Sequence, residues 1–526
     1  MKNRKIIVLL VTLVMLVTIM SACNNDPSEP AGGGEAVGGD EVAGGEDGED
    51  DEGEVALAPG EKEPVRFLYP GFAGELHEEL IERVNAMLDA DNMNIDFQPM
   101  PIGWDIWEQR VTLMFQAGEE FELVQVPEGF GPGYVQLWNM GASIRLNELI
   151  DEYGQNIKEL VPQWLWDAAT IDGNISTIPA NWVEVANYQG GISMRRDLLI
   201  RYGLDDPHDL DSLLEVSKIL QERMMEDQLY PRPAYVMMRY HEIATYQHRT
   251  YPTYPFSVFE QWLMIRQDGT VEAWVDTVEF EWDANWNHRL FTEGLIFPEL
   301  LGADLPVLEA DFGQGNYLFA ERNLSNACFG QRRESGFEEI LSTFIVFNPE
   351  EPMFRNQGVR NSNIVSSTSP NPSAAVRWHN WLYDSLENYL AVISGFEGLN
   401  YEIDEVGDMV PLHDAPTLGI ASWMIGNLDL QPIQSWFNEE YVASRATYDP
   451  NAINCISIGF AFDPTPVSVQ YANVLAEIPT VIYPLRAGVV SFEEGHPVAV
   501  AALRAAGIDE LVDEFQRQFT AWLETR

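Results

Sequence analysis

The feature that most constrains the fold is an alternation of two hydrophobic periods early in the chain. Short apolar runs at residues 65–69 and 121–126, and an alternating segment at 93–97, have the pattern of strands. Between them, residues 76–88 and 104–116 place apolar side chains at helical spacing. Three strands separated by two helices form a βαβαβ unit, and right-handed crossovers between the strands predict a parallel sheet.

The loops after these strands hold the first candidate binding residues. Ligands of open α/β sheets collect beyond the carboxyl ends of the strands, where loops and helix N-termini converge. The expected loops at 70–74, 99–105 and 127–133 each carry one large aromatic residue: Phe72, Trp104 and Phe130. Aromatic faces bind the apolar CH patches of sugars while neighbouring polar groups bind hydroxyls. Packing of these rings in a core or hinge is the alternative.

Further helical periodicity covers residues 146–153, 210–225, 374–383 and 508–523. The last segment is the most regular, with its apolar side chains on one stripe. The sequence shows no internal repeat with a period of about 20–50 residues, which argues against a helical solenoid. A length of 526 residues predicts two or three domains.

The N-terminus has the pattern of a signal peptide. Three cations precede an unbroken apolar run at residues 6–20. As a helix this run spans roughly 22 Å, less than the roughly 30 Å hydrocarbon core, so a permanent transmembrane helix is disfavoured. Met20-Ser21-Ala22-Cys23 resembles the lipobox of bacterial lipoproteins, with Met20 in place of the usual leucine. We expect a signal peptide at 1–22 and a diacylglyceryl group on Cys23; an incidental cysteine is the alternative.

Residues 23–64 are expected to be a disordered tether anchored by that lipid. From residue 24 onward the segment is rich in glycine, lacks aromatic residues and carries 14 acidic residues against one lysine. Such a segment cannot bury a core, and its charge keeps it extended. A calcium-binding tract is the alternative, but the required ligand spacing does not recur. The protein is therefore expected on the extracellular face of the cell membrane.

The body of the chain is strongly acidic. The formal charge is −53 overall, and residues 65–526 carry −43 of it. A surface this negative repels phosphate backbones and anionic head groups, so nucleic-acid partners are excluded and electrostatic membrane docking is disfavoured. Only five of the 30 basic residues are lysine. Arginine keeps its charge at high pH, so this composition is typical of exposure to brine or an alkaline medium; genomic bias is the alternative.

Catalytic and metal-binding motifs are scarce. The eight histidines form no i, i+4 pair, and no phosphate loop, G-x-S-x-G elbow or paired CxxC is present. With 83 carboxylates, some pair always lies at glycosidase distance, so carboxylates are no evidence for hydrolysis. We expect no enzyme activity, no cofactor and no metal. Cys328 and Cys455 either form a disulfide or remain two free thiols, and the sequence does not decide between these.

Several motifs resemble the extracellular solute-binding proteins of bacterial ABC importers. The first are at 149–157, at 168–179 with its Asp-Gly turn and Ile178-Pro179, and at 193–204. Towards the C-terminus the resemblance narrows to a lipoprotein subfamily with its own uncharacterised C-terminal domain, on the motifs at 366–372, 380–383, 395–401, 423–427 and 459–467. The order and spacing of the motifs, which cover most of residues 65–526, are more specific than any one of them.

The resemblance implies an α/β, two-lobed periplasmic-binding-protein-like fold of type II, with mixed sheets flanked by helices and a ligand cleft between the lobes. Lobe 1 is expected at 65–185 with a later segment near 360–415, lobe 2 at 190–355, and a C-terminal region at 416–526 that completes the lobes. The implied function is a monomer that captures a solute, most often a carbohydrate, and delivers it by hinge closure to the transmembrane subunits of an ABC permease.

The candidate ligand contacts are Phe72, Trp104, Phe130, Trp182, Trp423 and Asn427. The rings are expected to stack on the solute, and Asn427 to hydrogen-bond its hydroxyls. A surface-anchored glycoside hydrolase, a binder of a cationic solute such as a polyamine, and a sensory ligand binder remain alternatives. The sequence names neither the solute nor the permease.

Overall fold

The computed structural model describes residues 61–525 except 128–132, 183–190, 237–242, 249–255, 260–261, 298–313, 321–341, 347, 349, 356–358, 406, 413–416, 428, 431, 433–442, 444–445 and 448–449. All of these residues belong to one compact unit, Glu54–Arg526. The expected signal peptide, the lipidation site Cys23, nearly all of the tether, Phe130 and Cys328 lie outside the described residues.

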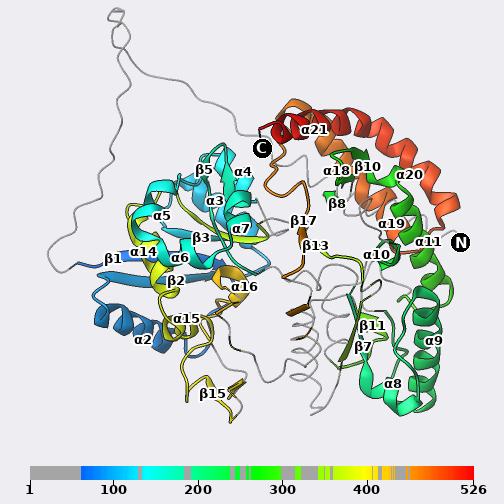
Figure 1. The fold of residues 1–526 in the computed structure, drawn as a ribbon, viewed down its shortest axis with the longest axis horizontal. Coiled ribbons are helices and arrows are strands. Elements are labelled where there is room, and N and C mark those ends of the chain that lie inside the picture. The colour runs from blue at the N-terminus through cyan, green and yellow to red at the C-terminus, as the bar shows by residue number, and fades with distance from the viewer. Residues whose placement is uncertain are drawn as a thin grey trace, which may run out of the picture. The chain divides into compact units, whose positions relative to one another are not determined.

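The first lobe is built on a five-stranded sheet of order β2-β1-β3-β14-β6 (Figure 1). The first three strands are parallel, as the βαβαβ pattern predicted, whereas β14 is antiparallel to both of its neighbours. β6 therefore runs in the same direction as β1 to β3, and the sheet is mixed. The elements are β1 (Glu63–Pro70), α2 (His77–Ala90), β2 (Ile95–Ile102), α3 (Trp107–Ala117), β3 (Leu123–Pro127), β6 (Ile178–Pro179) and β14 (Asn361–Val365).

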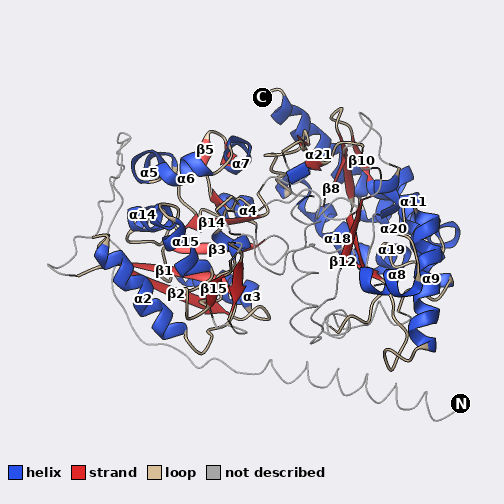
Figure 2. Cartoon of the chain, turned by 60° about the horizontal axis from the view of Figure 1, so that its bottom comes forward, coloured by secondary structure: helices blue, strands red, loops and turns tan. Residues whose placement is uncertain are grey.

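The helices and strands of this lobe are drawn in Figure 2. Apolar side chains are buried on both faces of its sheet. Along β1, Val65, Phe67 and Tyr69 contribute to one core cluster, while Leu68 contributes to another with residues of α3. Successive side chains of a strand point to opposite faces, so a strand with apolar side chains on both faces needs a covering layer on each side. The helices of the larger cluster are α2, α5 (Asn147–Tyr153), α6 (Gln155–Leu160), α7 (Gln163–Ala169), α14 (Pro372–Leu382), α15 (Leu386–Ile393) and α16 (Ser422–Ile425).

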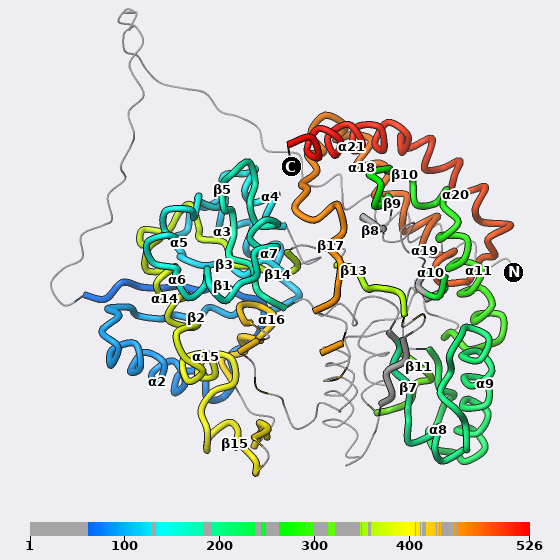
Figure 3. Tube along the Cα trace, viewed as in Figure 1, coloured from blue at the N-terminus to red at the C-terminus, as the bar shows by residue number. Residues whose placement is uncertain are grey.

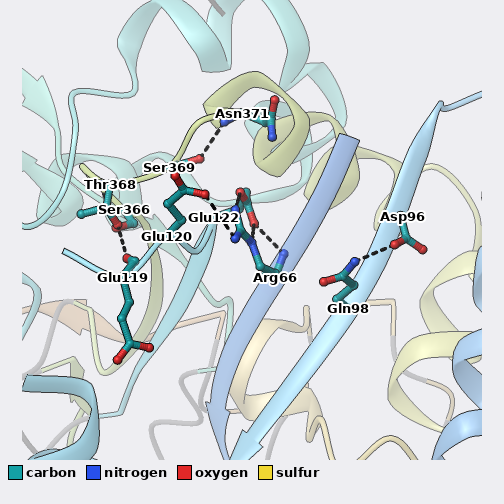
Figure 4. Close-up of polar contacts among 10 residues, drawn as sticks. All are labelled: Arg66, Asp96, Gln98, Glu119, Glu120, Glu122, Ser366, Thr368, Ser369 and Asn371. Carbon is teal, nitrogen blue, oxygen red and sulfur yellow. Dashed lines mark hydrogen bonds and ion pairs between the residues drawn. The ribbon is translucent and has the colours of Figure 1, made fainter. Parts of the chain in front are cut away.

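The chain returns late to this lobe (Figure 3). Trp378 of α14 stacks on Phe97 of β2 with ring centroids 4.4 Å apart. The preceding motif at 366–372 forms the loop between β14 and α14: Ser366 N–H donates to Glu122 O, and Thr368 Oγ1 donates to Glu119 O (Figure 4). The serines and threonine of this motif are thus turn residues that join the end of β14 to the start of β3.

The second lobe is centred on β7 (Gly191–Arg195), which pairs antiparallel with β11 (Phe319–Ala320) and β12 (Ser342–Val346). Arg195 is buried and donates to both carboxylate oxygens of Asp197, to Tyr230 Oη and to Gly315 O. This explains the Arg-x-Asp part of the motif at 193–204. Its helices are α8 (Arg196–Tyr202), α9 (Leu210–Glu226), α10 (Ile243–Gln247) and α11 (Val278–Thr292).

The C-terminal helices share a core with a hairpin sheet from the middle of the chain. Gln516 of the last helix hydrogen-bonds to this hairpin. Its Nε2 donates to Gly269 O at 2.9 Å, and its Oε1 accepts from Val271 N–H at 2.8 Å. The elements are β8 (Phe256–Phe259), β9 (Leu263–Arg266), β10 (Val271–Ala273), η2 (Trp274–Asp276), η4 (Thr465–Val467), α18 (Ser468–Val481), α19 (Tyr483–Arg486), α20 (Phe492–Ala506) and α21 (Ile508–Leu523). The expected helix at 508–523 is confirmed to the residue.

Short elements complete the described chain: β4 (Thr170–Ile171), β5 (Asn174–Ile175), α4 (Tyr134–Asn139), β13 (Phe354–Arg355), β15 (Tyr401–Ile403), β16 (Met409–Pro411) and β17 (Ile453–Asn454). Asp172 and Gly173, both with positive φ, form the turn between β4 and β5. Cys455 is buried as a free thiol, and burial raises its pKa to about 12. Within the described ranges, every helix is too short or too polar to cross a membrane.

Candidate functional site

Four strands of the first sheet end at one edge. In register, Pro70 of β1 lies beside Ile102 of β2, and Pro127 and Pro179 lie beside the first residues of β14. Gly71 N–H still donates to Ile102 O and Ala180 N–H to Asn361 O, so pairing ends just beyond Pro70 and Pro179. The chain therefore leaves β1, β2, β3 and β6 at the same carboxyl edge, where ligands of such sheets bind.

Phe72 and Trp104 occupy the first two of these loops. The expectation that the second loop begins at residue 99 is wrong, because residues 99–102 continue β2 and the loop begins at Gly103. Phe72 is 68% exposed and Trp104 is 38% exposed. A Cβ on Gly103 would lie 3.2 Å from Cε1 of Phe72, so the glycine lets the Phe72 ring pack directly on the neighbouring loop. The two loops are thus in contact and present their rings to solvent.

Trp423 comes from α16 and joins the same cluster. Its ring centroid lies 5.9 Å from that of Trp104, with the planes inclined by 33°. The approach to α16 is fixed against β1: Tyr69 Oη donates to Leu418 O at 2.5 Å, and a Cβ on Gly419 would lie 3.0 Å from Phe72 O. Gly419 has φ +78, which favours glycine at this close approach. Burial raises the pKa of Tyr69, so it remains a neutral donor.

Asn427 is placed below the cluster rather than on its surface. It is 0% exposed, its Nδ2 donates to Leu160 O, and its Oδ1 accepts from Asn181 Nδ2 and Asp429 N–H. Its main chain bonds Tyr389 Oη through both N–H and O. Asn427 has no exposed surface and holds the Asp429 main chain through the bond from Asp429 N–H. It does not present its amide to solvent, as a direct ligand contact requires.

Trp182 lies at the same edge, after β6. The preceding Asn181 bridges to Asn427, and the Trp182 ring is half-buried. Asp429 is an exposed carboxylate here that the sequence interpretation missed; its Oδ2 accepts from Asn181 Nδ2 at 3.3 Å. The signal available was its position two residues after Asn427, at the end of the 423–427 motif. Of the six candidate contacts, the structure brings Phe72, Trp104, Trp182 and Trp423 to one edge, buries Asn427 beneath it, and does not describe Phe130.

The exposed groups at this edge are mainly aromatic rings. The edge offers flat apolar rings with exposed carboxylates and backbone groups at their borders, which suits a ligand with both CH faces and hydroxyl groups. Among the described residues, no group of three or more His, Cys, Asp or Glu side chains is arranged to hold a metal ion.

Comparisons with known proteins bear on the fold. A family described as "Domain of unknown function (DUF3502)" matches residues 456–524. No curated protein matches the chain. The N-glycan transport solute-binding protein NgtS from Streptococcus pneumoniae superposes with a TM-score of 0.72 at 16% identity, over 88% of this chain and 99% of that chain.

Two further structures show the same likeness. An extracellular solute-binding protein from Bifidobacterium longum subsp. infantis gives a TM-score of 0.62 at 15% identity, over 89% of this chain and all of that chain. FusA, a substrate-binding protein of an S. pneumoniae ABC transporter, gives a TM-score of 0.60 at 14% identity, over 88% of this chain and 100% of that chain. The chain has the α/β periplasmic-binding-protein-like fold of these proteins. The DUF3502 match falls on the region to which the resemblance assigned a C-terminal domain of its own.

Proposed function

We propose that this protein is the solute-binding component of an ABC importer and that it captures an extracellular oligosaccharide. The observation that carries the proposal is the group of rings Phe72, Trp104, Trp182 and Trp423 at the carboxyl edge of the first sheet, within this fold. Structural neighbours support the ligand class: NgtS is described in complex with Man1GlcNAc and with Man5GlcNAc, and FusA in complex with kestose.

In this proposal the protein works by binding and closure, as a monomer without a cofactor. Rings stack on the CH faces of the sugar, while Asp429 and backbone groups accept hydroxyl hydrogens. Contacts from the second lobe exist only in a closed form, so the solute shifts the population towards that form. The closed form is then the one recognised by the transmembrane subunits of the permease.

The proposed location follows from the N-terminal sequence. Cleavage after residue 22 and lipidation of Cys23 place the folded body on the extracellular face of the membrane, on the 23–64 tether. Two acyl chains anchor stably because each buried methylene contributes roughly 0.8 kcal/mol. We expect Cys23→Ala to move the protein from the membrane fraction to the medium; a variant that stays on the membrane contradicts the lipid anchor.

The experiment that tests the function is a thermal-shift screen with neutral oligosaccharides, including Man1GlcNAc and kestose, followed by titration of intrinsic tryptophan fluorescence. Trp182→Ala is expected to weaken binding about tenfold, equivalent to about 1.4 kcal/mol. Trp522→Phe, in the C-terminal core, is the matched control and keeps the wild-type affinity. Stabilisation by none of the sugars overturns the proposed function, and unchanged affinity of Trp182→Ala removes that ring from the site.

A cationic solute such as a polyamine is a second candidate. The charge of −43 on residues 65–526 and the exposed carboxylate of Asp429 at the site favour it. Binding of spermidine in the same screen, with affinity that falls steeply between 0.1 and 1 M NaCl, selects this candidate, because salt screens charge pairs but not ring stacking. Release of reducing sugar from a polysaccharide would instead select the glycoside hydrolase, for which the neighbours named above offer no support.

A further inference from the structure

A hollow of about 550 Å³ adjoins the aromatic site along α3. Part of its wall is one face of that helix, where residues three and four apart lie side by side. These lining residues are Glu108, Gln109, Thr112, Leu113 and Gln116, and Asp105 joins them from the loop before the helix. The opposite stripe of the helix, Val111 and Met114 among it, is buried against the sheet. The core thus fixes the orientation of α3, and the helix presents polar side chains together with Trp107 and Leu113 to the hollow.

Trp104 belongs to both places. Its ring lies 5.9 Å from Trp423 in the aromatic cluster, and it also lines the hollow. The hollow and the aromatic cluster therefore share the Trp104 side chain. The volume of the hollow falls in the roughly 300–1,000 Å³ range of small-molecule sites.

Resting on the proposed function, we propose that this face of α3 is a second sugar subsite, and that the solute is a neutral oligosaccharide of at least two units that crosses Trp104. The side chains of Gln109, Thr112 and Gln116 both donate and accept hydrogen bonds, as sugar hydroxyls do. Carboxylates of Asp105 and Glu108 accept from hydroxyls but repel the carboxylate of an acidic sugar.

Charge on the helix supports the neutral assignment. The lining residues that the structure describes include no base. Arg110, the basic residue of α3, is off this stripe and lies 3.5 Å from Glu119 in an ion pair. A uronic acid that reached the subsite would thus face two carboxylates without a described counter-charge.

The first test is calorimetric titration of wild type and Gln109→Ala/Thr112→Ala with Man1GlcNAc, kestose, mannose and fructose. Alanine is a strong helix former, so α3 is expected to remain folded. We expect the double variant to lose about tenfold in affinity for the oligosaccharide that wild type binds. Mannose or fructose is expected to bind wild type at least tenfold more weakly than that oligosaccharide, with less than twofold change in the variant. Arg110→Ala, on the same helix but off the stripe, is the control and stays within about twofold of wild type.

The outcomes separate the two proposals. If wild type binds neither oligosaccharide, the proposed function fails and the subsite fails with it. If wild type binds an oligosaccharide but the double variant binds it equally well, or if wild type binds the monosaccharide as tightly, only the subsite is overturned.

The second test addresses charge, with trigalacturonate as the acidic probe. Wild type is expected to bind it at least tenfold more weakly than the neutral trisaccharide kestose. In Asp105→Asn/Glu108→Gln, the ratio of the dissociation constant for trigalacturonate to that for kestose should fall at least tenfold. Thermal unfolding of the variant checks that α3 is intact. Wild-type binding of trigalacturonate as tight as that of kestose, or a ratio unchanged in the variant, overturns the neutral assignment.

Discussion

The two ends of the β1–β3 pair in the first sheet are built in opposite ways. At the carboxyl end, the exposed rings of Phe72 and Trp104 follow β1 and its other neighbour β2, and both β1 and β3 end in proline. At the amino end of β3, Glu122 is fully buried beside Arg66 of β1. Its Oε1 accepts from Arg66 Nη2 at 2.7 Å, and its Oε2 accepts from Arg66 Nε and from the Arg66 main-chain N–H (Figure 4).

The difference indicates that the amino end of this sheet contributes to stability and that the carboxyl end is suited to binding. A carboxylate taken out of water must have its oxygens bonded, and here the guanidinium and a backbone donor provide those bonds. Hydrogen bonds to Glu122 raise the pKa of Arg66, so the guanidinium stays charged. At the carboxyl end, the rings of Phe72 and Trp104 lie beyond the paired residues, so we expect them to contribute little to the free energy of unfolding. We therefore expect changes at the amino end to alter unfolding and changes at the carboxyl end to alter affinity.

The largest effect is expected at the amino end. Arg66→Ala leaves the buried Glu122 carboxylate without its partner and should lower the free energy of unfolding by about 3–5 kcal/mol, measured by urea denaturation. The control is Arg83→Ala, which breaks an exposed i, i+4 pair with Glu79 and should cost about 0.5 kcal/mol or less. Equal losses in the two variants contradict the stabilising role of the buried pair, as does a change in sugar affinity at a temperature where Arg66→Ala is folded.

The next effect is a pH dependence of the core below the sheet. His379 of α14 is fully buried, and neither ring nitrogen hydrogen-bonds to another of the described residues; burial lowers its pKa to about 3. The unfolded chain binds this proton near pH 6.5, so stability is lost as the pH falls from 6.5 towards 3, by about 2 kcal/mol at pH 5.

His379→Leu should remove this contribution to the pH dependence of the free energy of unfolding, measured by denaturation at pH 7 and pH 5. His208→Ala, which changes an exposed histidine, should retain it. The assignment to His379 does not survive if both variants keep the wild-type slope.

A smaller effect in energy is expected at the carboxyl end. Trp104→Ala should weaken oligosaccharide binding about tenfold, about 1.4 kcal/mol, since Trp104 lines both the aromatic cluster and the hollow. Met140→Ala, which trims another exposed apolar side chain, should leave affinity unchanged. A Trp104→Ala protein that unfolds early but binds normally would reverse the comparison between the two ends.

The smallest effect is expected from salt on binding. A neutral oligosaccharide should keep its affinity within about twofold between 0.1 and 1 M NaCl, because an uncharged ligand has no charge pair for salt to screen. The unfolding midpoint should rise over the same range as the −43 of the body is screened. Identical midpoints remove the support for adaptation to brine.

Local pattern was enough to predict the elements of the first sheet. The apolar run at 65–69 became β1, and the helix expected at 508–523 has those bounds in the structure. The error in the second loop has a local cause: Pro99 and Pro101 suggested a turn, but both lie in β2, and its Pro101 pairs with Tyr69 at an edge of the sheet. The equivalent placement of Phe72 and Trp104 followed from the direction of parallel strands alone.

What lay beyond the sequence were contacts between distant segments. Trp423 was chosen from a motif, yet its packing on Trp104 depends on the 418–419 segment held against β1. Asn427 belongs to the same motif and is buried, because Leu160, Asn181 and Asp429 close around its amide. No local period distinguishes an exposed asparagine from a buried one.

The sequence by itself determined the strand–helix order, the aromatic residue after each strand and the acidity of the body, since these depend on neighbours a few residues apart. Only the tertiary structure decided that β14 enters the sheet antiparallel, that Glu122 is buried in an ion pair with Arg66, and that β9 and β10 share a core with the last helices. Such contacts join residues far apart in the chain, and they form only where burial of both partners offsets the entropy of bringing them together.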